Sequence, residues 1–187
     1  LKNNKIKLKI FGKHNMQNLA GAKIICNQLG VKNEEFYRSI ISYELPHKRL
    51  QIINNNKTKI FKDFAHSPSK LKATINAVKE NYNDKLLVCY ELHSSSSFEL
   101  SFLENYKDSL KNSDYSIIYI SEKKLNRFST KINQNQIKKI FNEKNLQLIS
   151  NPNSLEKLLK DLKYFNFNKL LMSSGNFDDL NFERIFK

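Results

Sequence analysis

Short apolar runs alternate with amphipathic segments from Arg49 onward, and this alternation constrains the fold more than any other feature of the sequence. The runs at 85–91 and 115–120 are almost continuously apolar, which is typical of strands buried on both faces of a parallel sheet. Segments with apolar residues at helical spacing lie between these runs. This order predicts an α/β domain with a mostly parallel sheet.

The expected elements of this part follow one another along the chain. The expected strands cover residues 49–53, 58–61, 85–91, 115–120, 146–149 and 169–172. The expected helices cover residues 67–81, 98–110, 133–144, 154–164 and 178–186. Parallel sheets bind ligands at the carboxyl ends of their strands. A binding site is therefore expected in the loops at 62–67, 91–97, 121–130 and 173–177.

The amino-terminal part of the chain has a different pattern. Alternating polar and apolar residues at 5–11 predict one strand, and helical spacing predicts two helices over 15–29 and 33–43. A Leu-Pro pair then ends the second helix, because the residue before proline disfavours the helical conformation. The change of pattern predicts a domain boundary that separates residues 1–46 from 47–187.

The chain is strongly basic, with a net charge of +14 in 187 residues. Lysines spread over every segment make up nearly all of the excess. A dedicated nucleic-acid-binding domain more often gathers Arg, Lys and exposed aromatics on one face. The distribution therefore favours solvated surface lysines and argues against nucleic acid as a partner. A non-catalytic basic module that binds nucleotide or nucleic acid remains the alternative from a different functional class.

The cysteines and histidines suggest a cytoplasmic protein without a metal site of its own. Cys26 and Cys89 lie inside apolar blocks, as buried thiols of a reducing compartment do. The four histidines are scattered, without the cysteine partners or the spacing of a zinc site. No apolar run approaches the roughly 20 residues of a membrane helix. We therefore expect no membrane partner.

The first motif lies at the start of the expected helix over 15–29. Asn15 and Asn18 are three residues apart and so share one helix face. Each carboxamide offers two donors and an acceptor, which suits the edge of an adenine base. The alternative interpretation is that His14 or Asn15 merely caps the helix and that Asn18 is solvated.

The second motif, Lys62-Asp63-Phe64-Ala65-His66-Ser67-Pro68, joins an expected strand to an expected helix. A helix amino terminus favours anions. Asp63 is suited to accept hydrogen bonds from ribose hydroxyls, and His66 is suited to meet a phosphate or a carboxylate. The alternative is a capped loop with an aspartate turn.

Two further polar loops follow expected strands. Glu91-Leu92-His93 leads into four consecutive serines, and Met172 leads into Ser173-Ser174-Gly175-Asn176. Each loop is either part of a substrate pocket or a simple structural feature, a serine-rich helix cap in one case and a tight turn in the other. No Gly-x-Ser-x-Gly sequence is present, so neither loop has the nucleophile of a serine hydrolase.

Three motifs in order resemble the Mur ligase family of bacterial cell-wall synthesis. They are Gly12-Lys13-His14-Asn15-Met16-Gln17-Asn18, Arg49-Leu50-Gln51 and Asp63-Phe64-Ala65-His66-Ser67-Pro68. Their order and spacing match the family, and the resemblance covers the whole chain. The serine-rich loop and the Ser173-Ser174-Gly175-Asn176 loop resemble the branch that contains the UDP-N-acetylmuramate–alanine ligases and the murein peptide ligases.

The resemblance implies two groups of site residues. The group near ATP would be His14, Asn15, Asn18, Arg49, Asp63 and His66. The group near the amine substrate would be Glu91, His93, Ser94, Ser95, Ser96, Ser173, Ser174, Gly175 and Asn176.

The resemblance also implies a fold and an activity. Residues 1–46 would be the end of the family's central ATPase domain, and 47–187 its Rossmann-like carboxyl-terminal domain. The activity would be ATP-dependent amide formation, in which an amino acid or peptide attacks an acyl phosphate of a UDP-N-acetylmuramate-type substrate. A folate-type polyglutamate ligase, which shares this architecture, is the rival within the same class.

The family's phosphate loop has no counterpart in this chain, which contains no Gly-x-x-x-x-Gly-Lys-Ser/Thr sequence. The magnesium ligands and the modified lysine of the family would also lie outside it. We therefore expect ATP and Mg²⁺ to depend largely on residues elsewhere, no catalytic residue within this chain, and no turnover by the chain alone.

Overall fold

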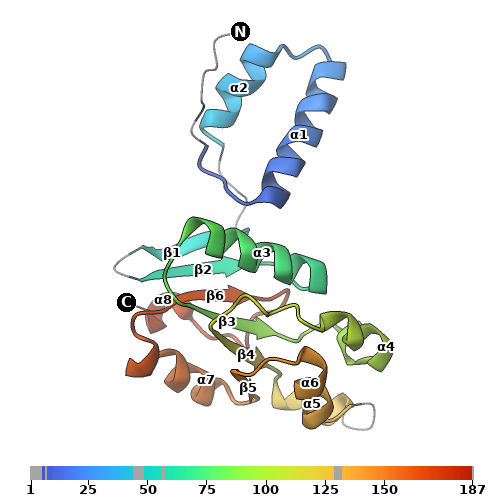
Figure 1. Cartoon of the computed structure of the whole chain (residues 1–187), viewed down its shortest axis with the longest axis vertical. Coiled ribbons are helices and arrows are strands. Elements are labelled where there is room, and N and C mark those ends of the chain that lie inside the picture. The colour runs from blue at the N-terminus through green and yellow to red at the C-terminus, as the bar shows by residue number, and fades with distance from the viewer. Residues whose placement is uncertain (1–5, 7, 44–48, 56–57, 129–131, 187) are drawn as a thin grey trace. The chain divides into compact units, whose positions relative to one another are not determined.

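The structure is a computed structural model that describes residues 6, 8–43, 49–55, 58–128 and 132–186. The chain separates into two compact units, Leu1–His47 and Lys48–Lys187 (Figure 1).

The first unit is a pair of helices, α1 (Lys13–Gln28) and α2 (Asn33–Ile41). Gly30 makes the connection between them at a φ of 91°, a conformation that glycine adopts without strain. The amine of Lys23 donates to the hydroxyl of Tyr37 at 2.7 Å and so joins the two helices. The two helices expected from the sequence are therefore present.

The strand expected over 5–11 does not form in the described residues of that segment. A strand needs a neighbour for its main-chain hydrogen bonds, and the described part of this unit pairs no second extended segment with it. Helix α1 is also less buried than its spacing suggests, since Ile25 is 59% exposed and Leu29 is 79% exposed. Among the described elements of this unit, the short helix α2 packs against α1, and it leaves part of the apolar face of α1 uncovered.

The second unit is built on a six-stranded sheet with the order β1-β2-β6-β3-β4-β5 in its described residues. The strands are β1 (Gln51–Asn55), β2 (Lys59–Asp63), β3 (Leu86–Glu91), β4 (Tyr115–Tyr119), β5 (Leu146–Ile149) and β6 (Asn168–Met172). β1 pairs with β2 in the antiparallel sense, and every other pair is parallel. The α/β fold with a mostly parallel sheet is confirmed.

Helices and short 3₁₀ turns connect the strands. The helices are α3 (Pro68–Asn81), α4 (Leu100–Leu103), α5 (Glu122–Phe128), α6 (Gln134–Phe141), α7 (Pro152–Leu159) and α8 (Phe182–Ile185). The 3₁₀ turns are η1 (Ser95–Phe98), η2 (Glu104–Tyr106) and η3 (Leu162–Tyr164). Asn133 and Asn151 cap α6 and α7 with their side chains, as short polar residues commonly do.

Both faces of the sheet are covered because alternate residues of each strand point to opposite sides. Cys89 packs on one side in a cluster with residues of α7 and α8. Its neighbour Tyr90 packs on the other side, with its ring centroid 5.7 Å from that of Tyr106, which in turn contacts Phe141 of α6. Every residue of β3 and β6 is buried, which explains why their sequences lack alternation.

Three expected helices are wrong in extent, and one helix was not expected. The helix expected over 154–164 ends at Leu159 of α7, and the separate turn η3 follows it. The segment 98–110 breaks into α4 and η2, and Asp108 has a φ of 57°, which a right-handed helix cannot contain. The helix expected over 178–186 shrinks to α8, because Asp178 and Asp179 also have positive φ. Conversely, α5 forms inside the segment 121–130 that was expected to be a loop.

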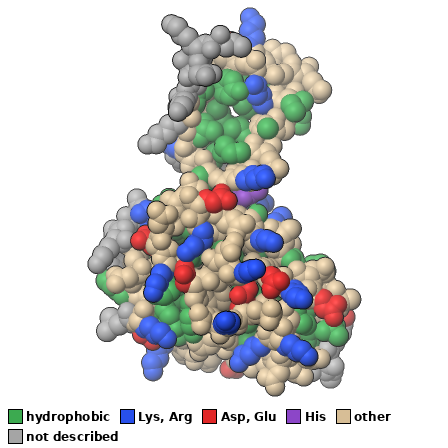
Figure 2. All heavy atoms as spheres, viewed as in Figure 1, with side chains coloured by type: hydrophobic (Ala, Val, Ile, Leu, Met, Phe, Trp, Pro, Cys, Tyr) green, Lys and Arg blue, Asp and Glu red, His purple; other side chains and the backbone are tan. Residues whose placement is uncertain are grey.

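Lys and Arg side chains are spread over the visible face of the molecule, with Asp and Glu among them (Figure 2). This distribution fits the expectation of solvated lysines. Among the described residues, no helix has the length and apolar character needed to cross a membrane.

Candidate functional site

The candidate site lies at the carboxyl ends of β2, β6 and β3, which are neighbours in the sheet. Asp63 ends β2, Glu91 ends β3, and Ser173 follows β6 directly. The main-chain nitrogen of Ser173 donates to the carbonyl of Asp63 at 3.1 Å, so the loops that leave β2 and β6 are joined. The parallel order of the strands thus brings all four expected ligand-binding loops to one edge, because β4, which precedes the segment 121–130, also pairs with β3 in the parallel sense.

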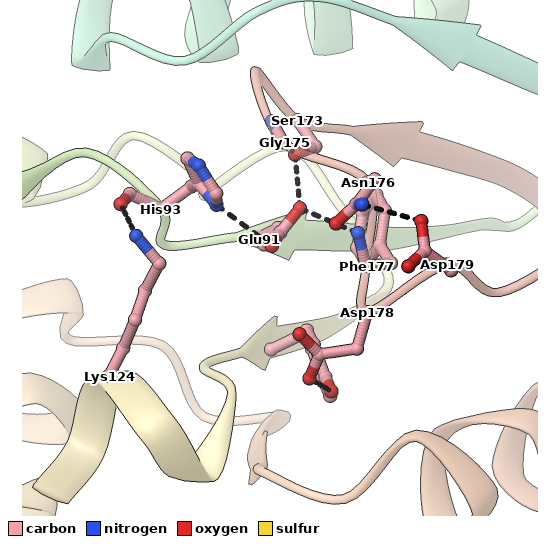
Figure 3. A network of polar contacts seen from close by, with 10 residues as sticks. Glu91, His93, Lys124, Ser173, Gly175, Asn176, Phe177, Asp178 and Asp179 are labelled. Atoms are coloured by element: carbon pink, nitrogen blue, oxygen red, sulfur yellow. Dashed lines mark hydrogen bonds and ion pairs between the residues drawn. The ribbon is translucent and has the colours of Figure 1, made fainter.

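Glu91 is the centre of a polar network on the α7–α8 face (Figure 3). Its side chain is only 2% exposed. One carboxylate oxygen accepts hydrogen bonds from the hydroxyl of Ser173 and from the main-chain nitrogen of Phe177, the latter at 2.9 Å. The other oxygen lies 3.1 Å from Nδ1 of His93. The carboxylate therefore ties the end of β3 to the loop after β6.

The contact with Glu91 assigns the donor on the His93 ring. A carboxylate can only accept, so Nδ1 carries the hydrogen and Nε2 is left for another partner. The His93 side chain is 36% exposed, so a ligand can reach it from solvent. The amine of Lys124, from α5, donates to the main-chain oxygen of His93, and burial lowers the pKa of this lysine.

Gly175 lies so close to this network that a larger residue would collide with it. A Cβ atom built there would lie 2.4 Å from Nδ1 of His93 and 2.7 Å from a carboxylate oxygen of Glu91. Its main-chain nitrogen donates to the hydroxyl of Ser173 at 2.6 Å. The glycine is thus explained by close approach of the two loops rather than by an easy turn.

A left-handed turn of three consecutive residues follows. Phe177, Asp178 and Asp179 have φ values of 53°, 51° and 63°. Such a conformation costs roughly 1–2 kcal/mol per L-residue, so side-chain contacts must hold it. Tyr119 donates its hydroxyl to Asp178, and Asn176 donates its amide to Asp179 at 2.6 Å. Burial, with the adjacent carboxylate of Asp178, raises the pKa of Tyr119.

The serine loop, residues Ser94–Ser97, starts at the end of the Glu91 segment. The hydroxyl of Ser94 lies 2.6 Å from that of Ser97 and 3.3 Å from that of Ser96. Ser95 and Ser96 are exposed, whereas Ser97 is fully buried. Ser94 occupies the N-cap position of η1 but makes no capping hydrogen bond with its side chain. The alternative of a serine-rich helix cap therefore has no support in the hydrogen bonds.

Asp63 is bonded entirely to its own chain in this structure. One carboxylate oxygen accepts from the main-chain nitrogen of Leu50 at 2.7 Å. The other accepts from the nitrogen of Ala65 at 2.7 Å and lies 3.3 Å from the hydroxyl of Thr74. These bonds stabilise Leu50 at a φ of 45° and fix the loop that carries His66. A contact between Asp63 and ribose stays a prediction.

Arg49 and His66 gather around Phe64. The guanidinium carbon of Arg49 lies 5.5 Å from the centre of the Phe64 ring, and the His66 ring meets the same ring edge-on. Nδ1 of His66 is 2.9 Å from the carbonyl of Phe64, so this nitrogen is the donor and Nε2 is available. The structure thus brings together the three residues of this unit that were assigned to ATP, although their binding role stays a prediction.

The other three predicted ATP-binding residues belong to the first unit. Asn15 is buried and donates its amide to the carbonyl of Phe11 at 2.8 Å, whereas Asn18 is exposed and His14 is half-buried. Gly12 occupies the N-cap position of α1, so neither His14 nor Asn15 caps the helix. Their proposed contact with adenine stays a prediction.

Ser174 is half-buried and Asn176 is exposed beside the Glu91 network. Within the part of the chain that is described, no three His, Cys, Asp or Glu side chains gather as a metal site requires.

Sequence reasoning missed several residues of the site. Lys124 was missed because α5 was not expected, and Asp178 because it was expected to begin a helix. Tyr119 carried no signal, since a tyrosine at the end of a buried strand looks like a core residue. Tyr119 and Asp178 meet although they are 59 positions apart, and no local pattern predicts such a contact.

Relatives of known name cover almost the whole chain. The UDP-N-acetylmuramate–L-alanine ligase of Ruthia magnifica is 26% identical over 181 residues, which are 91% of this chain and 38% of the relative. The enzyme of the same name from Fusobacterium nucleatum is 26% identical over 190 residues, 94% of this chain and 40% of the relative. The chain thus spans about two fifths of the length of these relatives. No family model matches it.

Solved structures show the same fold. The UDP-N-acetylmuramate–alanine ligase of Thermotoga maritima superposes with a TM-score of 0.73 at 18% identity, over 99% of this chain and 39% of the other. A murein peptide ligase of Psychrobacter arcticus gives 0.61 at 19% identity, over 100% and 39%. A folylpolyglutamate synthase of Thermotoga maritima gives 0.57 at 14% identity, over 93% and 38%.

The solved structures of these ligases superpose on nearly the whole chain, including the six-stranded sheet of the second unit. Over nearly its whole length, therefore, this chain is similar to UDP-N-acetylmuramate–L-alanine ligases, and it shares the fold of the matching part of the Thermotoga maritima enzyme.

Proposed function

We propose that this chain forms the amine-binding part and the nucleotide edge of an ATP-dependent ligase of peptidoglycan synthesis or recycling. The enzyme would join an amino acid or a murein peptide to the carboxylate of a UDP-N-acetylmuramate-type substrate. The observation that carries the proposal is the buried Glu91 network, which unites the ends of β3 and β6 at the ligand-binding edge of the sheet. Relatives named UDP-N-acetylmuramate–L-alanine ligase support the reaction class.

In such a reaction, ATP converts the carboxylate to an acyl phosphate, and an amine attacks it. The contribution of this chain would be positioning, which can supply much of the rate in two-substrate reactions. Nε2 of His93, left available by the Glu91 contact, is an acceptor for an amine hydrogen when the ring is neutral. Glu91 would act by holding His93 and the Ser173 loop in place.

On the nucleotide side, Arg49 and His66 offer positive charge or hydrogen-bond donors to phosphate or carboxylate oxygens. Asn15 and Asn18 would meet the adenine base from the first unit. ATP and Mg²⁺ would otherwise be held by residues outside this chain, in the phosphate loop of the longer enzyme. The second unit would act as a clamp that closes on the nucleotide, as mobile domains of many enzymes do.

The amine is proposed to be a murein peptide rather than free alanine. The sequences of the serine loop and of Ser173–Asn176 favour the peptide ligase branch. An alanine-specific ligase, a folate-type polyglutamate ligase and a non-catalytic basic module are the other outcomes that an assay must separate.

The test uses the complete gene product that contains this chain. ATP and UDP-N-acetylmuramate would be supplied with either L-alanine or an alanine-initiated tripeptide, and phosphate release and product mass would be measured. We expect product with the tripeptide and little with alanine. A parallel reaction with a reduced folate and glutamate tests the rival ligase.

Absence of phosphate release with all of these amines would overturn the ligase proposal. In that case, salt-dependent binding to a random oligonucleotide would favour the basic-module alternative. The 187-residue chain alone serves as the negative control and is expected to release no phosphate.

A further inference from the structure

A buried chain of hydroxyl groups lies on the opposite face of β3 from Glu91. Tyr90 and Tyr106 both donate to the carbonyl oxygen of His66, at 3.1 and 3.0 Å, and their two hydroxyl oxygens lie 2.8 Å apart. The hydroxyl of Ser97 lies 3.0 Å from that of Tyr106, and the hydroxyl of Ser94 lies 2.6 Å from that of Ser97. Contact is therefore continuous from the serine loop to His66.

The members of this chain come from separate segments of the fold. Tyr90 lies in β3, Tyr106 in η2 and Ser97 in η1, while His66 belongs to the loop before α3. The chain thus connects two loops that the sequence motifs treat independently, the one carrying His66 and the serine loop.

Three of the hydroxyls are closed to solvent. Tyr90 is 1% exposed, and Tyr106 and Ser97 are 0% exposed. Burial raises the pKa of both tyrosines, so their hydroxyls keep their protons at neutral pH. Ser94 is half-buried and is the member of the chain that reaches the surface.

The direction of these hydrogen bonds follows from counting protons. The carbonyl of His66 can only accept, and each hydroxyl has one proton to give. If Tyr106 gave its proton to Ser97, the three close contacts among Tyr90, Tyr106 and the carbonyl would share a single proton. The arrangement that gives the largest number of these contacts a proton therefore keeps both tyrosine protons on the His66 side.

The same count then fixes the two serines. In that arrangement Ser97 donates to Tyr106, whose own proton is already in use. Ser94 in turn donates to Ser97, and Ser96 is left to donate to Ser94. The proton of Ser94 consequently points inward, and its hydroxyl oxygen can offer only lone pairs to a ligand. A lone pair at that position suits an N–H group and does not suit a carboxylate or a phosphate.

We propose that Tyr106 is a positioning residue which, through this one-way hydroxyl chain, aligns the serine loop with the His66 loop and leaves Ser94 Oγ as an acceptor for an N–H group of the amine substrate. This inference rests on the proposed function for the identity of the ligand, but the hydroxyl chain itself does not. The two parts therefore need separate measurements.

The hydroxyl chain is tested in the 187-residue chain labelled with ¹³C at Cζ of tyrosine. In equal H₂O and D₂O, a hydroxyl that exchanges slowly splits its Cζ signal into two lines. We expect resolved pairs for Tyr90 and Tyr106, and we expect S97A to collapse the pair of Tyr106. S109A is the matched control, because Ser109 is 4% exposed and its hydroxyl has no partner among the described residues.

Two results would overturn the hydroxyl chain. One is a single averaged Tyr106 line in the unaltered protein, and the other is an equal effect of S97A and S109A. If S97A does not fold, S94A replaces it, since Ser94 is half-buried and its loss disturbs little packing. S94A is expected to speed exchange at Tyr106 less than S97A would.

The ligand is tested by kinetics in the complete gene product, with the tripeptide as amine substrate. We expect S94A and Y106F to raise KM for the tripeptide about five- to tenfold, the usual effect of one lost hydrogen bond. The kcat and the KM for ATP should change less than twofold. S94T keeps the hydroxyl and is expected to restore KM, and S109A is expected to leave it unchanged.

An unchanged KM for the tripeptide in S94A would overturn the assignment of Ser94, as would an S94T variant no better than S94A. If the unaltered protein has no ligase activity, the proposed function and the identity of the ligand both fail. The isotope measurement still decides in that case whether the hydroxyl chain exists, so the two failures are distinguishable.

Discussion

Glu91 and Tyr90 are neighbours in β3, yet the networks around them have opposite chemistry. The Glu91 side holds a buried carboxylate, a close-packed Gly175 and a left-handed turn. The Tyr90 side holds uncharged hydroxyls that lead from Ser94 through Ser97 and Tyr106 to the carbonyl of His66. Because successive side chains of a strand point to opposite faces, the carboxylate network and the hydroxyl network lie at the same edge of the sheet but on opposite faces.

The two networks are therefore expected to differ in how much stability the protein loses when one of their side chains is replaced. Removing a buried carboxylate leaves several donors without an acceptor and releases the contacts that hold a strained turn. Removing one hydroxyl from a chain of hydroxyls leaves neighbours that can bond to one another. We therefore expect substitutions around Glu91 to cost more stability than substitutions around Tyr90.

The largest effect is expected for Glu91→Ala. The hydroxyl of Ser173 and the nitrogen of Phe177 would lose their acceptor, and the free energy of unfolding should fall by about 3 kcal/mol. Urea denaturation measures this loss. Glu91→Gln keeps one acceptor oxygen and should lose about half as much. Equal stability of the alanine variant and the unaltered protein would show that the network does not hold the loop.

A smaller loss, about 2 kcal/mol, is expected for Gly175→Ala, the range in which overpacking usually falls. The new Cβ would overlap the contact between His93 and Glu91. The matched control is Gly21→Ala, because nothing lies within 4 Å of a Cβ at that exposed helical position. Thermal unfolding of both variants should lower Tm for Gly175→Ala alone. A similar Tm for the two would contradict the close approach.

On the Tyr90 side, Tyr106→Phe should cost about 1 kcal/mol at pH 7. Its pH dependence is the sharper measurement. Burial raises the pKa of Tyr106 in the folded protein, so unfolded chains lose this proton first as the pH rises above about 10. Stability should then fall with pH, by up to about 1.4 kcal/mol per pH unit for each such group.

Between pH 10 and 11, the free energy of unfolding of Tyr106→Phe should therefore fall less steeply with pH than that of the unaltered protein. The two slopes should differ by at most the contribution of one proton. Tyr115→Phe is not a suitable control, because burial also raises the pKa of Tyr115, to about 12. Ser97→Ala is better suited, since it breaks the same chain without removing a phenol. Identical slopes for Tyr106→Phe and the unaltered protein would contradict a buried, protonated Tyr106.

The smallest effect is expected for Lys124→Met, about 0.5 kcal/mol. Lys124 holds the carbonyl of His93 with one hydrogen bond from a partly exposed amine, which contributes little in water-accessible surroundings. The exposed neighbour Lys123→Met is the control and should change nothing. Chemical denaturation of both variants would decide, and a loss for Lys124→Met as large as that for Glu91→Ala would contradict the minor contribution of this contact.

Sequence periodicity was sufficient for the strands, because burial on both faces demands continuous apolar runs whatever their partners are. The expected strand at 85–91 agrees closely with the fully buried β3, and the one at 146–149 agrees with β5, although Gln147 of β5 is exposed. Periodicity gave a wrong prediction for 5–11, because the described part of this unit contains no second strand with which that segment could pair. A strand signal is local, whereas strand pairing is not.

The candidate site was predictable only as a set of loops. Strand order places the loops after β2, β3 and β6 together, and the motifs in those loops named Asp63, His66 and Glu91. Which of them bind ligand stays a prediction.

The sequence by itself determined the α/β class, the positions of the buried strands and the family resemblance, since these depend on composition and spacing along the chain. The tertiary structure alone decided the left-handed turn at 177–179 and the hydroxyl chain that ends at His66. Both depend on contacts between residues far apart in sequence, such as Glu91 with Phe177 and Tyr106 with His66. Local propensity cannot predict such contacts, because their free energy exists only when the sheet brings the partners together.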